Sequence, residues 1–339
     1  MTSLTKTIAC FGETVLRLAV PVGEFPLQSP RLDAYVGGAE TNVAVALSAL
    51  GHPVRMLGAV PEGPVGDAAA SELRRHGVDA AHMLRPAGRM GLYYHLPGGA
   101  MRPAEVVYDR ADSAFAAAKT DDWRWDELLA GVNWLHVSGV TPALGQQSAE
   151  ATLAAVRAAR AAGIRISFDG NWRGRLWSRW NSDPAATLRP IVAEADVLFG
   201  NHRDATLLLG RDFSGDGPDR RRDAALALLD AFPTLETVAS TARHIVEPTK
   251  HQIVARIDRR DDHAQTGTAD ITPITDRIGT GDAFAAGVID GLLTTETLGA
   301  AVQRGLALAA LKHGLQGDFA PFTRHMVESV SFTAADVAR

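Results

Sequence analysis

The sequence predicts an α/β protein in which helices cover both faces of a mostly parallel sheet and a small second sheet stands apart. Three observations carry this prediction. Strand-like and helix-like segments alternate through residues 134–209, as parallel strands joined by helices require. Residues 88–113 instead contain two short strands around a turn. The 339 residues, 46% of them hydrophobic, are enough to bury one large core with a small appendage.

Composition argues against several classes of protein. The net charge is −5, and the densest basic cluster, 220–222, is flanked by Asp219 and Asp223, so we expect no nucleic-acid binding. No apolar run reaches about 18 residues, and we expect neither a membrane span nor a signal peptide. Cys10 is the only cysteine, which excludes an internal disulfide. We therefore expect a cytoplasmic protein in which Cys10 is a buried strand residue.

The first third of the chain contains the first expected strands and helices. Residues 8–20 follow a strand pattern that Gly12 interrupts, and residues 21–33 form a turn-rich connection. A strand over 54–60 and an amphipathic helix over 65–76 follow.

A glycine pair precedes the first helix. Gly37 and Gly38 come directly before an apolar pattern of helical spacing that Gly51 ends. Two glycines at this point would let a ligand contact the backbone, and Asn42 offers both a donor and an acceptor. An ordinary turn from strand to helix is the alternative.

The two short strands, 90–96 and 105–110, predict an antiparallel pair. Tyr93 and Tyr108 lie on them, where packing across the strands is an alternative to ligand contact. Arg110 favours ligand contact, because a cation there suits a carboxylate or phosphate. The predicted division assigns 14–33 and 88–113 to the small sheet and 1–13, 34–87 and 114–339 to the α/β core.

Polar residues follow the buried strands of the alternating region. In open parallel sheets ligands bind beyond the carboxyl ends of the strands, where Asn171, Arg173, Asn201 and Asp204 are expected. A solvated loop is the alternative for the first two residues. Helix capping is the alternative for the last two.

A second glycine motif follows the late strands expected within 235–258. The backbone N–H groups of Gly279, Thr280, Gly281 and Asp282 would converge at the start of a helix, which attracts anions, and the Asp282 side chain could accept a proton. The lysine of a Walker loop and the third glycine of a dinucleotide fingerprint are both missing. A simple turn with an aspartate cap is the alternative.

The last long helix is expected over 298–313.

Together these motifs resemble those of the ribokinase-like (PfkB) carbohydrate kinases. The resemblance rests on Gly-Gly-Ala-Glu-x-Asn at 37–42, on the inserted strands, and on Asp-Arg-Ile-Gly-x-Gly-Asp at 276–282, and it extends over nearly the whole chain. Within that family the chain is most similar to 2-keto-3-deoxygluconate kinases, through Val-Ser-Gly-Val-Thr-Pro at 137–142, Phe-Asp-x-Asn-x-Arg at 168–173 and Leu-Lys-His-x-x-x-Gly-Asp-Phe at 311–319.

The resemblance implies a ribokinase-like three-layer α/β/α fold with a β-sheet lid, and ATP and Mg²⁺ as cofactors. It implies that Gly279, Thr280 and Gly281 bind the transferred phosphoryl group and that Asp282 is the base. The residues that it implies for sugar binding are Gly37, Gly38, Asn42, Tyr93, Tyr108, Arg110, Arg173 and Asp318. Asn171, a polar residue at a strand end, is expected to join them.

On the nucleotide side the sequence departs from the family pattern. Asn201 and Asp204 replace the usual Asn-x-x-Glu, so that Asp204, the expected metal ligand, carries a shorter side chain. The common Lys-x-Gly signature is absent, and Thr241 and Arg243 stand there as candidate phosphate contacts. Thr280 replaces the usual alanine.

We therefore expect a kinase that transfers the γ-phosphate of ATP to a hydroxyl of 2-keto-3-deoxygluconate. The alternatives are fructose, ribose or 2-keto-3-deoxygalactonate as the sugar, or a sugar- or nucleotide-binding protein on the same fold without catalysis. Exposed edges of the lid sheet predict a homodimer or a higher homo-oligomer.

Overall fold

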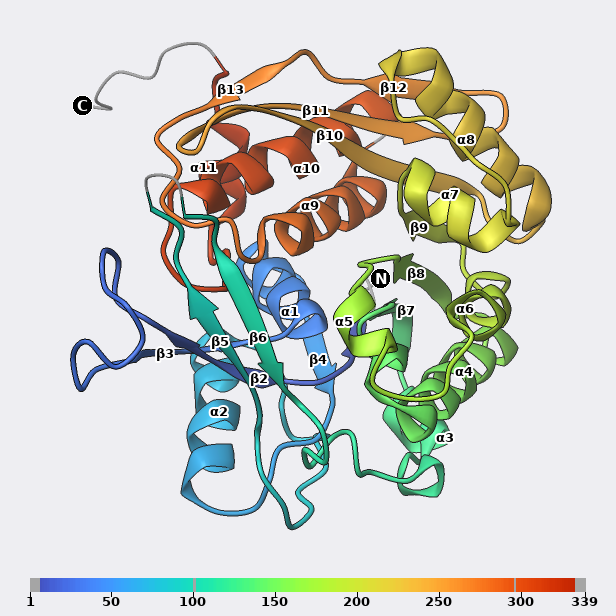
Figure 1. Cartoon of the computed structure of the whole chain (residues 1–339). Helices are drawn as coiled ribbons and strands as arrows, with labels where there is room; N and C mark the ends of the chain where they lie inside the picture. The colour runs from blue at the N-terminus through green and yellow to red at the C-terminus, as the bar shows by residue number, and fades with distance from the viewer. Residues whose placement is uncertain (1–6, 100–101, 296, 333–339) are drawn as a thin grey trace.

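The structure is a computed structural model that describes residues 7–99, 102–295 and 297–332. Its main sheet has nine strands in the order β12-β11-β10-β9-β8-β7-β1-β4, with β13 paired to β11 (Figure 1). The strands are β1 (Thr7–Phe11), β4 (Val54–Leu57), β7 (Val132–Ser138), β8 (Arg165–Asp169), β9 (Val197–Phe199), β10 (Thr237–Glu247), β11 (Lys250–Asp258), β12 (His263–Gln265) and β13 (Ala269–Ile271).

Six neighbouring strands of this sheet, from β4 to β10, run parallel. The strands β11, β12 and β13 add an antiparallel edge. Because the central strands are buried on both faces, they consist of almost continuous apolar runs. The carboxyl ends of β1, β7, β8 and β9 therefore meet at one edge of the sheet. This arrangement confirms the predicted mostly parallel α/β fold.

Helices cover both faces of the main sheet and form two cores. One face packs against α1 (Ala39–Ala49), α2 (Pro64–Arg75), α9 (Thr280–Thr294), α10 (Leu298–His313) and α11 (Arg324–Glu328). The other packs against α3 (Trp125–Leu128), α4 (Gln146–Ala161), α5 (Gly174–Trp177), α6 (Pro184–Val192), α7 (His202–Leu209) and α8 (Gly217–Ala231). Strand β1 serves both cores, because Ile8 and Cys10 face the first and Ala9 and Phe11 the second. Cys10 is fully buried, as predicted.

The small sheet, which we call the lid, has the strand order β3-β2-β5-β6 and lies beside α1 and α2 (Figure 1). Its strands are β2 (Val15–Ala19), β3 (Asp33–Gly37), β5 (Gly91–Leu96) and β6 (Glu105–Asp109). The pair β5/β6 is antiparallel, as predicted. The expected boundary after residue 33 is wrong, because β3 pairs with β2 as far as Gly37. The chain therefore passes from the lid into α1 across Gly38 alone.

The basic cluster at 220–222 lies near the start of the 15-residue helix α8. None of the helices described is both long and apolar enough to cross a membrane.

Candidate active site

The second glycine motif starts α9, as predicted. Gly279 is the N-cap residue, with a left-handed φ of 79°, and a Cβ there would lie 2.1 Å from the backbone oxygen of Asp318. Only glycine fits both constraints. The backbone N–H groups of Gly281 and Asp282 have no acceptor among the described residues. They are the free donors that make a helix start suitable for an anion.

The side chain of Thr280 is turned back onto its own loop. Its hydroxyl donates to the backbone oxygen of Arg277 at 3.0 Å. This bond satisfies the extra hydroxyl and ties together the two ends of the loop. A Cβ on Gly281, by contrast, would meet nothing within 4 Å, so Gly281 faces open space.

Asp282 is a buried carboxylate, and it joins the two glycine motifs. Asn42 of α1 donates from Nδ2 to Asp282 Oδ2 at 2.6 Å, and Asn42 Oδ1 has no partner among the described residues. Burial raises the pKa of Asp282 to about 7, and the hydrogen bond from Asn42 and the charge of Arg173 oppose this rise only in part. A carboxyl group with such a pKa can accept a proton near neutral pH.

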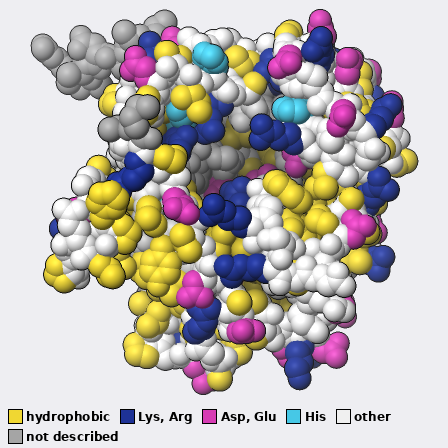
Figure 2. Space-filling model, viewed as in Figure 1, with side chains coloured by type: hydrophobic (Ala, Val, Ile, Leu, Met, Phe, Trp, Pro, Cys, Tyr) yellow, Lys and Arg dark blue, Asp and Glu magenta, His cyan; other side chains and the backbone are white. Residues whose placement is uncertain are grey.

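A cavity of about 580 Å³ lies between the lid and the start of α9. We call it the sugar cavity, after the residues in it that are expected to contact a sugar. Most of the residues expected to contact the sugar or the phosphoryl group line it, together with Arg277 and Asp169: Gly38, Asn42, Tyr93, Tyr108, Arg110, Asn171, Arg173, Gly279, Thr280, Gly281, Asp282 and Asp318. Figure 2 shows a hollow in this face of the molecule with Lys and Arg side chains gathered at its rim.

Gly37 is the exception among the expected sugar contacts, because it does not line this cavity. A Cβ on Gly37 would lie 2.2 Å from Oδ2 of Asp318. The missing side chain therefore makes room for the Asp318 carboxylate and not for a ligand. Gly279 is also in close contact with Asp318, so a glycine of each motif packs against this one residue.

Arg110 is buried and paired, unlike the free cation that the sequence suggested. Its Nε donates to Glu13 Oε2 at 2.5 Å, which reduces what it can offer a ligand. Arg173 is exposed, and among the described residues its side chain donates only to the backbone oxygen of Trp172, from Nη1 at 3.1 Å. Arg277 has no side-chain partner among the described residues. The two arginines of the sugar cavity that remain open to an anion are thus Arg173 and Arg277.

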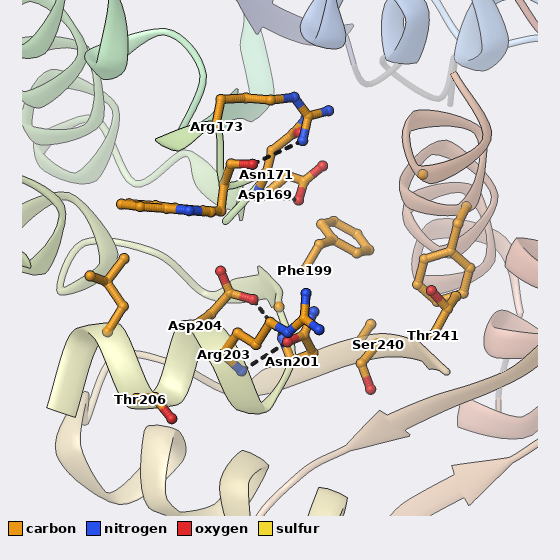
Figure 3. A pocket seen from close by; sticks show the side chains of 16 residues that line it. Asp169, Asn171, Arg173, Phe199, Asn201, Arg203, Asp204, Thr206, Ser240 and Thr241 are labelled. Atoms are coloured by element: carbon orange, nitrogen blue, oxygen red, sulfur yellow. Dashed lines mark hydrogen bonds between the residues drawn. The ribbon is translucent and has the colours of Figure 1, made fainter. Parts of the chain in front are cut away.

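Two further cavities, of about 630 and 530 Å³, lie on the other side of Gly281, and we call them the first and second nucleotide-side cavities. Asn201 and Thr241 line both, Asp204 lines the first and Arg243 the second. Figure 3 shows the first, with Asp169, Asn171 and Arg173 on one wall and Asn201 and Asp204 on the facing wall. Gly281 lines all three cavities.

Asn201 and Asp204 cap α7, which is the alternative that the sequence left open. Asn201 Oδ1 accepts from the backbone N–H of Arg203 at 2.9 Å, and Asp204 Oδ2 accepts from that of Asn201 at 2.7 Å. Burial raises the pKa of Asp204 to about 6. The pKa of Asp169 is raised well above its usual value, first by burial and then by the charges of Asp282 and Asp204. The described residues contain no cluster of three or more metal-ligating side chains.

Several buried charged residues around this site were not among the predicted site residues, although three of them lie in the motifs that carry the family resemblance. They are Glu13, Arg17, Glu40, Asp276 and Lys312. Glu40 Oε1 accepts from Ser138 Oγ at 2.7 Å and from Thr141 Oγ1 at 2.8 Å, which fixes the start of α1 against the end of β7. A single cation within an apolar strand was the available signal for Arg17, since β2 reads Val-Leu-Arg-Leu-Ala.

Comparisons with known proteins agree with this geometry. Residues 5–322 match the family described as pfkB family carbohydrate kinase. A 2-dehydro-3-deoxygalactonokinase from Haloferax volcanii is 35% identical over 332 residues, which cover 96% of this chain and 97% of the relative. A 2-dehydro-3-deoxygluconokinase from Bacillus subtilis is 27% identical over 295 residues, covering 84% of this chain and 82% of the relative.

A solved structure gives the same result for the fold. The crystal structure of a 2-dehydro-3-deoxygluconokinase from Thermotoga maritima superimposes with a TM-score of 0.89 at 32% identity, and the match covers 95% of this chain and 98% of that one. The match to the family extends from β1 to the turn that carries Asp318, and so includes the glycine motifs, the lid and all three cavities. The chain therefore belongs to the pfkB family of ATP-dependent carbohydrate kinases.

Proposed function

We propose that this kinase transfers the γ-phosphate of ATP to a hydroxyl of 2-keto-3-deoxygluconate. The observation that carries the proposal is the position of Asp282. Its buried carboxyl, with a pKa of about 7, lines the sugar cavity beside Gly281, which also lines both nucleotide-side cavities. A base at that junction can meet a sugar hydroxyl that faces a terminal phosphate.

In this mechanism the Asp282 carboxylate accepts the hydroxyl proton while the sugar oxygen bonds to the γ-phosphorus. The bond from that phosphorus to the β,γ-bridging oxygen breaks, and the electron pair leaves with ADP. The free N–H groups of Gly281 and Asp282 stabilise the charge on the transferred group. Asn42 holds the carboxylate in one orientation.

The acid group of the sugar has two candidate partners. Arg173 and Arg277 line the sugar cavity without a carboxylate partner among the described residues. A neutral hexose has no charge for them, whereas a sugar acid supplies a carboxylate that guanidinium groups bind through charge-assisted hydrogen bonds. This contrast favours a ketodeoxy acid over fructose or ribose.

Mg²⁺ fits the first nucleotide-side cavity. Asp169 and Asp204 line it from facing walls, and burial raises the pKa of both, which the charges of Arg173 and Arg203 offset only in part. Mg²⁺ is typically held by one or two carboxylates, water and phosphate oxygens, and when bound it neutralises charge on the phosphates. We propose that these two carboxylates hold it, with Asn201, Thr241 and Arg243 nearer the phosphates of ATP.

The second candidate substrate is 2-keto-3-deoxygalactonate, the epimer of the first. The relative that is 35% identical over almost the whole chain carries the name of that activity. The two arginines would bind the carboxylate of either acid equally well, since the epimers differ only in the direction of one hydroxyl.

A cytoplasmic location, expected from the single cysteine, stays a prediction.

A coupled assay of ADP release tests the proposal against both epimers, fructose and ribose. We expect the highest kcat/KM with 2-keto-3-deoxygluconate. We expect a loss of about 10²- to 10⁴-fold in Asp282→Asn, the size of a general-base contribution. Preference for the epimer would move the assignment to the second candidate. Preference for a neutral sugar would reject a sugar-acid kinase. Calorimetric binding of sugar and ATP without ADP release would indicate the silent binding protein.

A further inference from the structure

Arg17 is a buried cation that joins the lid to the phosphate-binding motif. It lies on β2, its side chain has no exposed surface, and it does not line the sugar cavity. Its Nη1 donates to Asp276 Oδ2 at 2.7 Å and to Asp318 Oδ1 at 3.3 Å. A buried guanidinium needs carboxylates to pair with it, and the Nε of Arg17 is buried without a partner among the described residues, so this position is costly to maintain.

A second lid strand contributes to the same cluster. The Nη2 of Arg17 lies 2.7 Å from Nδ1 of His95 on β5. Because an arginine can only donate, His95 accepts with an unprotonated Nδ1. Burial, and then the charge of Arg17, lower the pKa of His95 to about 4, which keeps the ring neutral. Tyr93, also on β5, donates its hydroxyl to Asp318.

The two carboxylates that Arg17 holds shape the loop before α9. Asp276 Oδ1 accepts from the backbone N–H of Ile278 at 3.0 Å, and its Oδ2 accepts from that of Gly317 at 3.1 Å. The backbone of Asp318 is in close contact with Gly279. One guanidinium therefore connects the lid strands, the loop 276–279 and the turn 317–318.

We propose that Arg17 is a positioning residue for phosphoryl transfer. It couples the position of the lid over the sugar to the position of the loop that binds the transferred phosphoryl group. It acts through Asp276 and Asp318 and touches neither substrate. The proposal rests on the proposed function only in that both concern the same phosphoryl-transfer site. Any sugar that the wild type phosphorylates can be used to test it.

The chain contains a matched control for a purely structural ion pair. Arg304 on α10 donates from Nη1 to Asp290 Oδ2 at 2.6 Å, and the Asp290 side chain is fully buried. Neither residue lines the sugar cavity or the nucleotide-side cavities. Loss of Arg304 should therefore lower stability without altering the loop 276–279.

The experiment compares Arg17→Met, Arg17→Lys and Arg304→Met by kcat, by both KM values and by the midpoint of thermal unfolding. We expect Arg17→Met to lower kcat by about 10- to 100-fold, as small misplacements of reacting groups do, with Arg17→Lys in between. The KM for ATP should change less than kcat. Arg304→Met should lower the unfolding midpoint and keep kcat within about twofold of wild type. Equal kcat losses in Arg17→Met and Arg304→Met at similar stability would overturn the proposal.

A second measurement needs neither turnover nor a known sugar. Native-state hydrogen exchange of the amides in 276–282 should be faster in Arg17→Met or, if that variant does not fold, in Asp276→Asn. Arg304→Met should leave these amides unchanged. Unchanged exchange in the Arg17 and Asp276 variants would overturn the positioning role. Failure of the wild type to phosphorylate any sugar acid would reject only the proposed substrate.

Discussion

Asp282 owes its proton affinity to its surroundings. Its usual pKa is 3.8, and burial raises it to about 7, with Glu40 and Asp318 adding to the rise. In the proposed mechanism only the ionised form accepts the hydroxyl proton, so we expect kcat/KM for the sugar to fall about tenfold per pH unit below pH 7. Initial rates between pH 5 and 9, at constant ionic strength and saturating Mg²⁺, measure this. An acidic limb with its midpoint below pH 5 would contradict it.

The same raised pKa predicts a change of stability with pH. The folded protein binds more protons at Asp282 than the unfolded chain does between the usual pKa of 3.8 and the native value of about 7, so this group destabilises the fold as pH rises through that window. Asp282→Asn removes the effect. The unfolding midpoint of the variant relative to wild type should therefore rise from pH 5 to pH 8, and a constant difference would contradict the assignment.

The open arginines of the sugar cavity predict substrate selectivity. Hydrogen bonds to charged groups contribute about 1.5–3 kcal/mol, so Arg173→Gln and Arg277→Gln should each raise the KM for the sugar acid about 10- to 100-fold. Any slow turnover of fructose should be unaffected. Arg89→Gln is the control, because Arg89 pairs with Asp109 on the lid outside the sugar cavity. An unchanged KM in both cavity variants would reject the carboxylate role.

At the scale of single residues, the sequence indicated the groups that line the cavity better than the groups that support it. Asn42, Tyr93 and Asp282 stand in motifs whose local spacing signals chemistry, and the fold brings them together. The support that Arg17 gives depends on strand register and on a partner 259 residues away in sequence. No local pattern contains that information. The pairing of Arg110 with Glu13, 97 residues apart, was missed for the same reason.

At the scale of elements, the start of α9 separates two uses of glycine. Gly279 has a left-handed φ and no room for a Cβ, whereas Gly281 lies in the helix with open space beside it. Gly279→Ala should lower the free energy of unfolding by more than about 1 kcal/mol and also lower activity. Gly281→Ala should raise the free energy of unfolding by up to about 1 kcal/mol through helix propensity. Its methyl group should crowd the phosphate that we propose binds there, and so lower kcat/KM for ATP.

Chemical denaturation and steady-state kinetics on the two glycine variants together test this assignment. Each variant is the control for the other, because both add one methyl group to the same turn. Equal losses of stability would show that the conformation of Gly279 is not the constraint we describe.

Elements with strong periodicity were predictable almost to the residue. The helix expected over 298–313 is α10, with the same bounds. Strand β3 was not predicted, because its burial follows no clean alternation and it continues directly into the glycine pair. Helix α8 begins among charged residues, and its apolar face only becomes clear from Ala224 onward. The predicted bounds of elements were wrong where pairing with a distant strand, and not local periodicity, sets the end of the element.

At the scale of the whole molecule, the lid has features that predict self-association. Its edge strands are β3 and β6, and the loop between β2 and β3 exposes Val22, Phe25 and Leu27, the last at 90%. Figure 2 shows hydrophobic side chains on this side of the molecule. We expect a dimer, with light scattering giving twice the 36.0 kDa of one chain.

A substitution pair tests whether this dimer forms through the lid. Leu27→Glu should yield monomers, because it places a charge in the contact. Met326→Glu, at an exposed apolar position on α11 that is 44% accessible, should not. A wild-type mass of a single chain would exclude the dimer.

The shared position of Gly281 has a consequence for inhibitor design. Because one glycine lines the sugar cavity and both nucleotide-side cavities, the sites proposed for the two substrates adjoin at that residue. A single molecule that tethers a ketodeoxy acid to adenosine through a phosphate chain would occupy both sides at once. Its second half would bind at the high effective concentration that a short linker provides.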